Sequence, residues 1–387
     1  MSLAIKPIAC HGGCLGCYQK EIRESGVEPK FEIAKVIETL TTQMALDKEN
    51  KWNSPTIHGG EPLLLPIDEI ELILKTVFEK YGRSGIQTSG ILITAEHIEL
   101  FKKYKTCIGV SIDGDTAETN AGRWDAPGFD VAEMTSKTLE VLAMLKEAKI
   151  STSVIIVLRK CNAGTLALRS DLIRFALRLK DEFGVDSIRF NPLIAFDERT
   201  KKEEIFHMSL SDIYIQLIRK VFIDESLKWY PALDFIKILN GGSGECVFGE
   251  CDPWATEAEI PILGDGSLSV CMKREGLILR TEKSRARYEI LPQVSQEVGG
   301  CKGCFWWMYC KGGCPGAGID GDWRDRTRFC EAYKATFSFA SSLSVFDKQA
   351  VNCNNSNHGD SHGDKPHGDS NDPAWRKAHP EWKGGIK

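Results

Sequence analysis

Hydrophobic and polar positions follow two alternating periods along the first 225 residues. Short runs rich in β-branched and apolar residues, such as "CIGVSI" at 107–112, are each followed by a longer stretch with helical spacing, such as "IDEIELILKTVFEKYG". Runs of the first kind predict strands, and apolar residues recurring every three or four positions predict helices. Six strand–helix units are therefore expected, with strands at residues 2–8, 54–58, 84–88, 107–112, 150–157 and 186–193.

Alternating strands and helices predict an α/β fold with a parallel sheet covered by helices. Six units favour a partial (β/α)6 barrel of the TIM type, in which chemistry sits at the C-terminal ends of the strands. Toward its end the chain becomes polar and rich in Gly, Asn, Asp and His, a composition typical of disorder. We expect the barrel at 1–225, a linker at 226–245, a cysteine-rich, loop-rich domain at 246–345 and a disordered tail at 346–387.

Length, composition and charge limit the number of domains and the kinds of partner that the protein can have. The chain has 387 residues, of which 42% are hydrophobic and 27% charged, enough for two domains with a substantial core. It has neither an apolar stretch of about 18 residues nor an export signal at its N-terminus, so we expect a cytoplasmic protein without a membrane partner. A net charge of -5 with interspersed signs offers no basic surface, so no nucleic-acid partner is expected.

The fourteen cysteines are the main chemical signal of the sequence. Three of them, Cys10, Cys14 and Cys17, follow the first predicted strand, and eight more lie between Cys246 and Cys330. Because the cytosol keeps thiols reduced, metal or iron–sulfur ligation is a better interpretation than a disulfide framework. The first group supplies only three thiolates, which would leave one coordination site of a bound cluster open.

The motifs that follow the first four predicted strands resemble those of radical S-adenosylmethionine (SAM) enzymes. The cysteine triad, "HGGEP" at 58–62, "QTSG" at 87–90 and "VSIDGD" at 110–115 occur in the order of that family. The resemblance implies that the triad holds a [4Fe-4S] cluster whose fourth iron chelates SAM. It also implies that electron transfer into SAM releases a 5'-deoxyadenosyl radical, which abstracts a hydrogen atom from the substrate.

The same resemblance implies a set of SAM contacts. Glycines in the "GGEP" turn let the backbone approach a ligand closely, and the glutamate with its neighbouring backbone can accept hydrogen bonds from the methionine ammonium. The polar residues of "VSIDGD" share one side of a strand end, where a ribose or carboxylate could meet them. An arginine further on is a candidate partner for an anionic group. The alternatives are a plain β-turn and a surface salt bridge. The predicted contacts are Gly59, Gly60, Glu61, Pro62, Ser111, Asp113, Arg123 and Tyr18.

Tyr18 enters this set because of a departure from the family pattern. Family members usually carry an aromatic residue directly before the third cysteine, where it packs near the adenine. This chain has Gly16 there, and Tyr18 follows the cysteine instead. Tyr18 either replaces that contact or packs as a core residue. The sequence assigns no catalytic acid or base.

The later cysteines are similar in spacing to a SPASM domain, with a C-x14-G-x4-C stretch from Cys251 followed by C-x2-C-x5-C-x3-C from Cys301. The resemblance implies two auxiliary [4Fe-4S] clusters, hence three in all. A zinc ribbon is the alternative, because paired cysteines also suit tetrahedral zinc. The implied ligands are Cys246, Cys251, Cys271 and Cys314 for the first auxiliary cluster and Cys301, Cys304, Cys310 and Cys330 for the second.

SPASM domains accompany radical SAM enzymes that modify peptides or proteins. The resemblance therefore implies maturation of a ribosomally made peptide, for which we favour a crosslink such as a cyclophane or thioether. Anaerobic sulfatase maturases, which form formylglycine, carry an acidic residue after the cysteine corresponding to Cys271, whereas this chain has Met272. Formylglycine formation and a small-molecule substrate are the alternatives, and a non-catalytic electron carrier is the least favoured. The expected partners are a peptide or protein substrate and an electron donor such as flavodoxin or ferredoxin.

Overall fold

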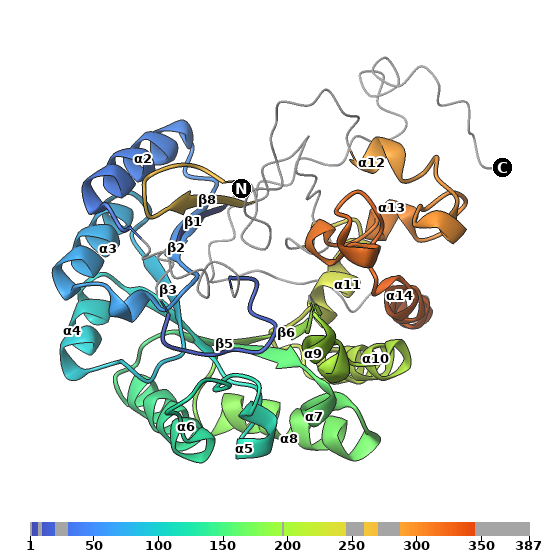
Figure 1. Cartoon of the computed structure of the whole chain (residues 1–387), viewed down its shortest axis with the longest axis horizontal. Helices are drawn as coiled ribbons and strands as arrows, with labels where there is room; N and C mark the ends of the chain where they lie inside the picture. The colour runs from blue at the N-terminus through green and yellow to red at the C-terminus, as the bar shows by residue number, and fades with distance from the viewer. Residues whose placement is uncertain are drawn as a thin grey trace.

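The computed structural model describes residues 2–6, 10–19, 30–195, 197–244, 259–269 and 287–344. Within these ranges one parallel sheet of eight strands runs in the order β7-β6-β5-β4-β3-β2-β1-β8. The sheet curves as an open barrel, with the helices on its outer face (Figure 1). The strands are β1 (Ser2–Lys6), β2 (Asn53–Ile57), β3 (Ser84–Thr88), β4 (Thr106–Ser111), β5 (Thr152–Leu158), β6 (Ser187–Pro192), β7 (Trp229–Tyr230) and β8 (Glu259–Leu263).

The predicted α/β fold is confirmed, and each of the six predicted strands overlaps an observed one. The sheet nevertheless extends past residue 225. β7 comes from the range predicted as a linker, and β8 comes from the predicted cysteine-rich domain. β8 pairs in parallel with β1, from Ser2 opposite Glu259 to Lys6 opposite Leu263. Burial of Ile260 and Ile262 accounts for this return of the chain to the sheet.

The covering helices are amphipathic, as the periodicity predicts. In α3, for example, Ile70, Ile73, Leu74 and Val77 are buried, and the helix ends at Gly82, whose φ of 68° suits a glycine C-cap. The long helices over the sheet are α2 (Ile33–Leu46), α3 (Ile67–Tyr81), α4 (Ala95–Lys103), α6 (Val131–Glu147), α8 (Leu166–Asp181) and α10 (His207–Ile223). Shorter helices are α5 (Ala117–Asn120), α7 (Lys160–Ala163), α9 (Glu198–Glu203), α11 (Ala232–Leu239), α12 (Arg287–Ile290) and α13 (Trp307–Cys310).

The cysteine-rich region shares a core with the barrel. Its last helix, α14 (Cys330–Ser344), packs against α10 and α11 (Figure 1). The contact is aromatic: the rings of Phe235 and Phe337 lie 4.6 Å apart edge to face, and Tyr214 and Tyr333 pack beside them. Such pairs add to the energy of burial, so the two parts stabilise each other.

Several predicted features lie outside the described residues. These are Cys246, Cys251, Cys271, Met272 and the tail at 346–387. None of the helices in the described ranges is long and apolar enough to cross a lipid bilayer.

Candidate active site

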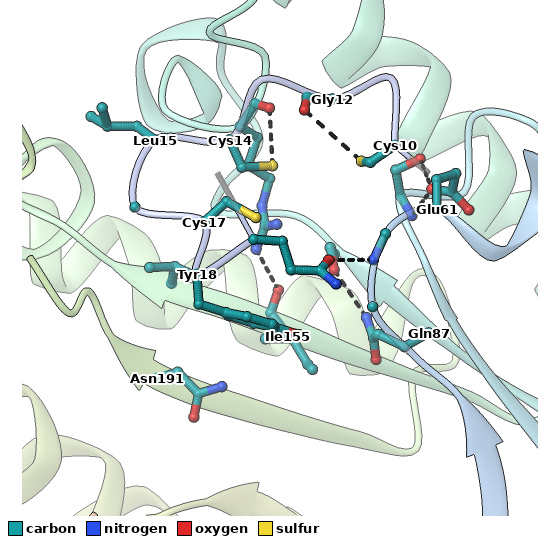
Figure 2. Close-up of a pocket in the computed structure, with 18 of the residues that line it drawn as sticks. Cys10, Gly12, Cys14, Leu15, Cys17, Tyr18, Glu61, Gln87, Ile155 and Asn191 are labelled. Carbon is teal, nitrogen blue, oxygen red and sulfur yellow. Dashed lines mark hydrogen bonds between the residues drawn. The ribbon is translucent and has the colours of Figure 1, made fainter. Parts of the chain in front are cut away.

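A cavity of about 280 Å³ lies at the C-terminal ends of the strands, where the fold predicts the chemistry (Figure 2). The loop after β1 forms one wall and carries the three cysteines. The segments after β2 and β3 and the ends of β4, β5 and β6 form the rest. Motifs far apart in the sequence therefore meet around one space.

The cysteine loop presents its three sulfur atoms to this space. Figure 2 shows the sulfurs of Cys10, Cys14 and Cys17 pointing toward the inside of the loop. The Cys14 thiol donates to the carbonyl oxygen of Arg123 at 3.2 Å. The backbone N–H of Leu15 donates to the Gly122 carbonyl at 2.7 Å. The segment after β4, through Gly122 and Arg123, thus holds the cysteine loop in place.

Burial keeps these thiols protonated while no metal is bound. Burial, with the neighbouring Cys14, raises the pKa of Cys10 to about 12, and burial also raises the pKa of Cys14. Buried thiols of this kind ionise when a metal replaces the proton. Within the described ranges no three His, Cys, Asp or Glu side chains converge on a single ion. A [4Fe-4S] cluster needs no such convergence, because each thiolate binds a different iron, so the donor set fits that group.

The "GGEP" turn follows β2 and is held by hydrogen bonds of Gly60 and Glu61. Gly59 and Gly60 have φ values of 98° and 62°, a backbone conformation that residues with a side chain rarely adopt. The Gly60 N–H donates to Gln19 Oε1 at 2.6 Å. The buried Glu61 carboxylate accepts from the Thr88 hydroxyl at 2.6 Å and from the Ser89 hydroxyl at 2.6 Å. Glu61 therefore joins the ends of β2 and β3 at the cavity wall, which a plain surface turn would not do.

Pro62 supports the turn from behind. It is buried and begins the 3-10 helix η1 (Pro62–Leu64), where a proline needs no backbone donor. The Glu61 side chain caps this short helix by accepting from the Leu63 N–H at 3.3 Å. Contact between the turn and a methionine ammonium stays a prediction.

Asp113 pairs with two arginines next to the cavity. Its side chain is fully buried and is not part of the cavity wall. One oxygen accepts from Arg123 Nη2 at 2.7 Å and from the Val157 N–H at 2.7 Å, and the other accepts from Arg159 Nε at 3.3 Å. Two arginines from separate segments therefore take up the Asp113 oxygens, and contact of this side chain with a ribose or carboxylate stays a prediction.

Ser111 and Arg123 do reach the cavity. The Ser111 hydroxyl accepts from Gln87 Nε2 at 2.9 Å, which links the ends of β4 and β3. Arg123 is buried, with 10% of its side chain exposed, so the alternative of a surface salt bridge is excluded. Contact of either side chain with SAM stays a prediction.

Tyr18 lines the cavity, with the Lys6 ammonium 5.7 Å from its ring centroid. The structure explains why Gly16 takes the place of an aromatic residue. Gly16 has a φ of 78°, and a Cβ there would lie 2.3 Å from Leu193 Cδ1. An aromatic side chain at this position would strain the backbone and displace the Leu193 side chain. The adenine contact of Tyr18 remains a prediction.

Sequence reasoning missed several residues of the cavity wall. His11 stacks on Trp124 with ring centroids 6.1 Å apart and 13° between the planes, forming an aromatic wall. Burial lowers the pKa of His11, which favours its neutral form. Arg159 also lines the cavity and donates through Nη2 to the Leu15 carbonyl at 2.9 Å. It directly follows β5, so the strand-end rule used for the other motifs could have found it.

The four cysteines assigned to the second auxiliary cluster line one buried pocket. Cys301, Cys304, Cys310 and Cys330 share it with Trp306 and Tyr333. Burial together with the nearby Cys330 and Cys304 raises the pKa of Cys301 to about 12, and burial raises the pKa of Cys310. The grouping fits four thiolate ligands for one [4Fe-4S] cluster, in which each thiolate binds a different iron.

Cations and backbone contacts organise this second pocket. Arg287 is buried and donates to the carbonyls of Gly312 at 2.9 Å and Asp325 at 2.8 Å, so it ties two loops together. Positive charge from Lys334 and Arg326 lowers the pKa of Cys330 against the larger effect of burial. Cys314 is buried but does not line this pocket, and its three assigned partners lie outside the described ranges.

Comparison with known proteins defines the class. Residues 7–166 match the radical SAM superfamily. The protein is therefore an enzyme with a radical SAM domain, which confirms the resemblance drawn from the four strand-end motifs.

Relatives extend the likeness over most of the chain. The cysteine-type anaerobic sulfatase-maturating enzyme of Clostridium perfringens (strain ATCC 13124) is 22% identical over 381 residues, covering 88% of this chain and 96% of its own. The serine-type anaerobic sulfatase-maturating enzyme of Bacteroides thetaiotaomicron is 26% identical over 174 residues, covering 41% of this chain and 40% of its own.

Solved structures share the fold. Native anSMEcpe with bound AdoMet and the Cp18Cys peptide superimposes with a TM-score of 0.67 at 19% identity, covering 89% of this chain and 98% of its own. Streptococcus suis SuiB bound to S-adenosylmethionine superimposes with a TM-score of 0.55 at 16% identity, covering 85% of this chain and 76% of its own.

Proposed function

We propose that this enzyme modifies a peptide or protein by abstracting a hydrogen atom from one of its residues. The observation that carries the proposal is the meeting of the cysteine triad and the "GGEP" turn around one cavity, in a chain whose second pocket gathers four more cysteines. When bound to Cys10, Cys14 and Cys17, a [4Fe-4S] cluster supplies the electron that cleaves SAM reductively.

The chain's own residues position the reactants. The "GGEP" backbone and Arg123 line the cavity and can bind the polar groups of SAM. Tyr18 lines the same cavity with an aromatic ring. The stacked rings of His11 and Trp124 form an aromatic wall on one side of the cavity.

The second pocket supports an auxiliary iron–sulfur cluster on Cys301, Cys304, Cys310 and Cys330. We infer a further cluster on Cys246, Cys251, Cys271 and Cys314, which brings the total to three. An auxiliary cluster can accept the electron that the substrate loses when its product forms. An external carrier such as flavodoxin or ferredoxin would deliver the reducing electron.

A peptide substrate is supported by the character of the similar proteins. The anSMEcpe structure contains the Cp18Cys peptide, and a SuiB structure contains the precursor peptide SuiA. SuiB covers 84 to 85% of this chain with a TM-score above 0.5. These similarities favour a peptide substrate over a small-molecule substrate.

We favour an intramolecular crosslink because of Met272. A thioether cannot take the proton that aldehyde formation must release, whereas the sulfatase maturases carry an acidic residue at this point. Formylglycine formation is the second candidate. It is favoured by the relatives that match nearly their whole length, which are cysteine-type sulfatase-maturating enzymes.

Intact mass of a treated peptide tests the proposal. The probe is the peptide encoded by a short reading frame next to this gene, incubated with reconstituted enzyme, SAM and dithionite. A crosslink removes two hydrogen atoms and lowers the mass by about 2 Da, and proteolysis then fails to separate the joined residues. Formylglycine made from cysteine lowers the mass by about 18 Da and reacts with hydrazides. A hydrazide-reactive product would refute the crosslink, and an unchanged mass with active SAM cleavage would refute that peptide as substrate.

A further inference from the structure

The pocket of the second group of cysteines is lined by positive charge. Its four cysteines share the wall with two cationic side chains, Arg326 and Lys334. Among the residues that the structure describes, no carboxylate lines this pocket. An iron–sulfur cluster held by four thiolates is an anion, and it gains one more negative charge when it takes up an electron. Both cations therefore stand where negative charge increases on reduction.

The two cations differ in how far their charge is already balanced. The Lys334 ammonium pairs with the Glu331 carboxylate at 3.0 Å and donates to Gln296 Oε1 at 2.9 Å. Within the described ranges, the Arg326 side chain donates only to backbone carbonyls, those of Gln296 and Gly300. An arginine keeps its charge inside a protein, so Arg326 brings the less balanced of the two charges to the pocket wall.

The guanidinium of Arg326 is fixed, and one of its donors is left over. Nη1 donates to the Gly300 carbonyl at 2.9 Å, directly before Cys301, and the backbone N–H of Arg326 donates to the Gly299 carbonyl at 2.9 Å. Nε is buried and has no hydrogen-bond partner in the described part of the chain. A buried donor without an acceptor is costly, and the sulfur atoms of a cluster accept such hydrogen bonds.

The charge of Arg326 reaches two of the four sulfur atoms. Burial raises the pKa of Cys301 and of Cys330, and the positive charge of Arg326 acts against this at both thiols. A cation that stabilises a thiolate also stabilises a cluster that has gained an electron, because both changes add negative charge. Arg287 acts on Cys301 in the same direction, but it does not line the pocket.

We propose that Arg326 raises the reduction potential of the cluster held by Cys301, Cys304, Cys310 and Cys330. Its charge, and a hydrogen bond from Nε to a sulfur atom, stabilise the reduced form, which holds one electron more than the oxidised form. The second pocket is thereby suited to take up the electron that the substrate loses when the product forms. This inference rests on the proposed auxiliary cluster and not on which bond is formed in the peptide.

A redox titration followed by electron paramagnetic resonance tests this without peptide. The sample is the full-length chain, anaerobically reconstituted, with the cysteine triad replaced by alanine to remove the signal of the first site. The signal that disappears when the four cysteines of the second pocket are also replaced belongs to that pocket. Arg326→Gln should lower the equilibrium constant for its reduction about tenfold, which is about 59 mV for one electron. Arg326→Lys keeps the charge without the planar donor group and should lower it only about threefold.

Arg328→Gln is the matched control. Arg328 lies two residues from Arg326 and also has a buried Nε without a partner in the described ranges. It pairs with Glu204 at 3.4 Å, however, and does not line the pocket. Its replacement should change the equilibrium constant less than about twofold. Iron content is measured in every variant, so that only loaded pockets are compared.

A loaded Arg326→Gln variant with the potential of the parent would overturn this inference alone, because Arg326 would then only support the loop before Cys301. An equal shift in Arg328→Gln would overturn it as well. If Arg326→Gln does not hold its iron, Arg326→Lys decides: an unchanged potential, or loss of iron there too, refutes the assigned role. A parent pocket that binds no iron would overturn both this inference and the auxiliary cluster on which it rests.

Discussion

Asp113 and Arg123 form a buried ion pair with 2.7 Å between Oδ1 and Nη2, directly beneath the cavity that carries the cysteine triad. The carbonyl of the same arginine accepts from the Cys14 thiol. The pair therefore connects the interior of the barrel with the loop expected to hold the catalytic cluster. The Asp113 carboxylate is turned toward Arg123 and is not part of the cavity wall.

Replacing Asp113 by asparagine should destabilise the fold. The change keeps the shape of the side chain but leaves two buried guanidinium groups without their counter-charge, which costs about 3 to 5 kcal/mol. Urea unfolding of the metal-free protein measures this. The control is Asp115→Asn, because Asp115 pairs with Arg178 at the surface and such pairs contribute under about 1 kcal/mol. Similar losses in the two variants would contradict the assigned role.

Gly16→Ala should be more harmful than Gly128→Ala. Both glycines have left-handed backbone, with φ of 78° and 89°, so each change adds about 1 to 2 kcal/mol of strain. Only at Gly16 would the new Cβ also meet Leu193, at 2.3 Å, whereas nothing lies within 4 Å at Gly128. That crowding should add about 1 to 3 kcal/mol in thermal or urea unfolding. Equal effects at the two positions would show that Leu193 yields freely.

Asp234 should make stability depend on pH. Burial raises its pKa from 3.8 to about 6, although Arg189 lies 3.8 Å away. Between these pH values the folded protein binds more protons than the unfolded chain, so the free energy of unfolding falls as pH rises and the loss is complete above about pH 6. Asp234→Asn should remove about 2 to 3 kcal/mol of this dependence in urea unfolding at pH 4 and pH 7. A slope as steep in the variant as in the parent would rule this out.

Iron content tests the assignment of the cysteines. Three clusters correspond to about twelve iron atoms per chain after anaerobic reconstitution. Replacing Cys10, Cys14 and Cys17 together by alanine should remove about a third of the iron. The parent should contain no stoichiometric zinc, and a parent with about four iron atoms would contradict the two auxiliary clusters.

The second cysteine pocket has its own variant. Replacing Cys301, Cys304, Cys310 and Cys330 together should remove a different third of the iron and leave the first site loaded. The two losses should be additive, because the sites lie in separate pockets. Loss of all iron in either variant would mean that the pockets do not load independently.

The fold was largely predictable from local patterns. Each apolar run, such as 107–112, forms a strand in the interior of the sheet. In that strand its apolar side chains, for example those of Ile108 and Val110, are removed from water. β7 and β8 were missed because the first is two residues long and the second lies among cysteines whose spacing drew the interpretation toward a separate domain.

The site was predictable where one short segment carries the whole signal, as in the cysteine triad and the "GGEP" turn. It was not predictable where a role depends on partners distant in the sequence. The contact between Asp113 and Arg159, which is 46 residues later, is one example. In the same way, the contact between Arg159 and Leu15 spans 144 residues, and no local pattern records it.

Cleavage of SAM is the most direct test of the central claim that the Cys10, Cys14 and Cys17 loop carries radical SAM chemistry. Anaerobically reconstituted protein is mixed with SAM and dithionite, without peptide, and 5'-deoxyadenosine is measured by liquid chromatography and mass spectrometry. The parent should form it, and Cys14→Ala should abolish it, because two thiolates cannot hold the cluster with one open iron. The variant lacking Cys301, Cys304, Cys310 and Cys330 should keep at least part of the cleavage. A fully loaded parent that forms no 5'-deoxyadenosine, or a Cys14→Ala variant that forms as much as the parent, would contradict the account.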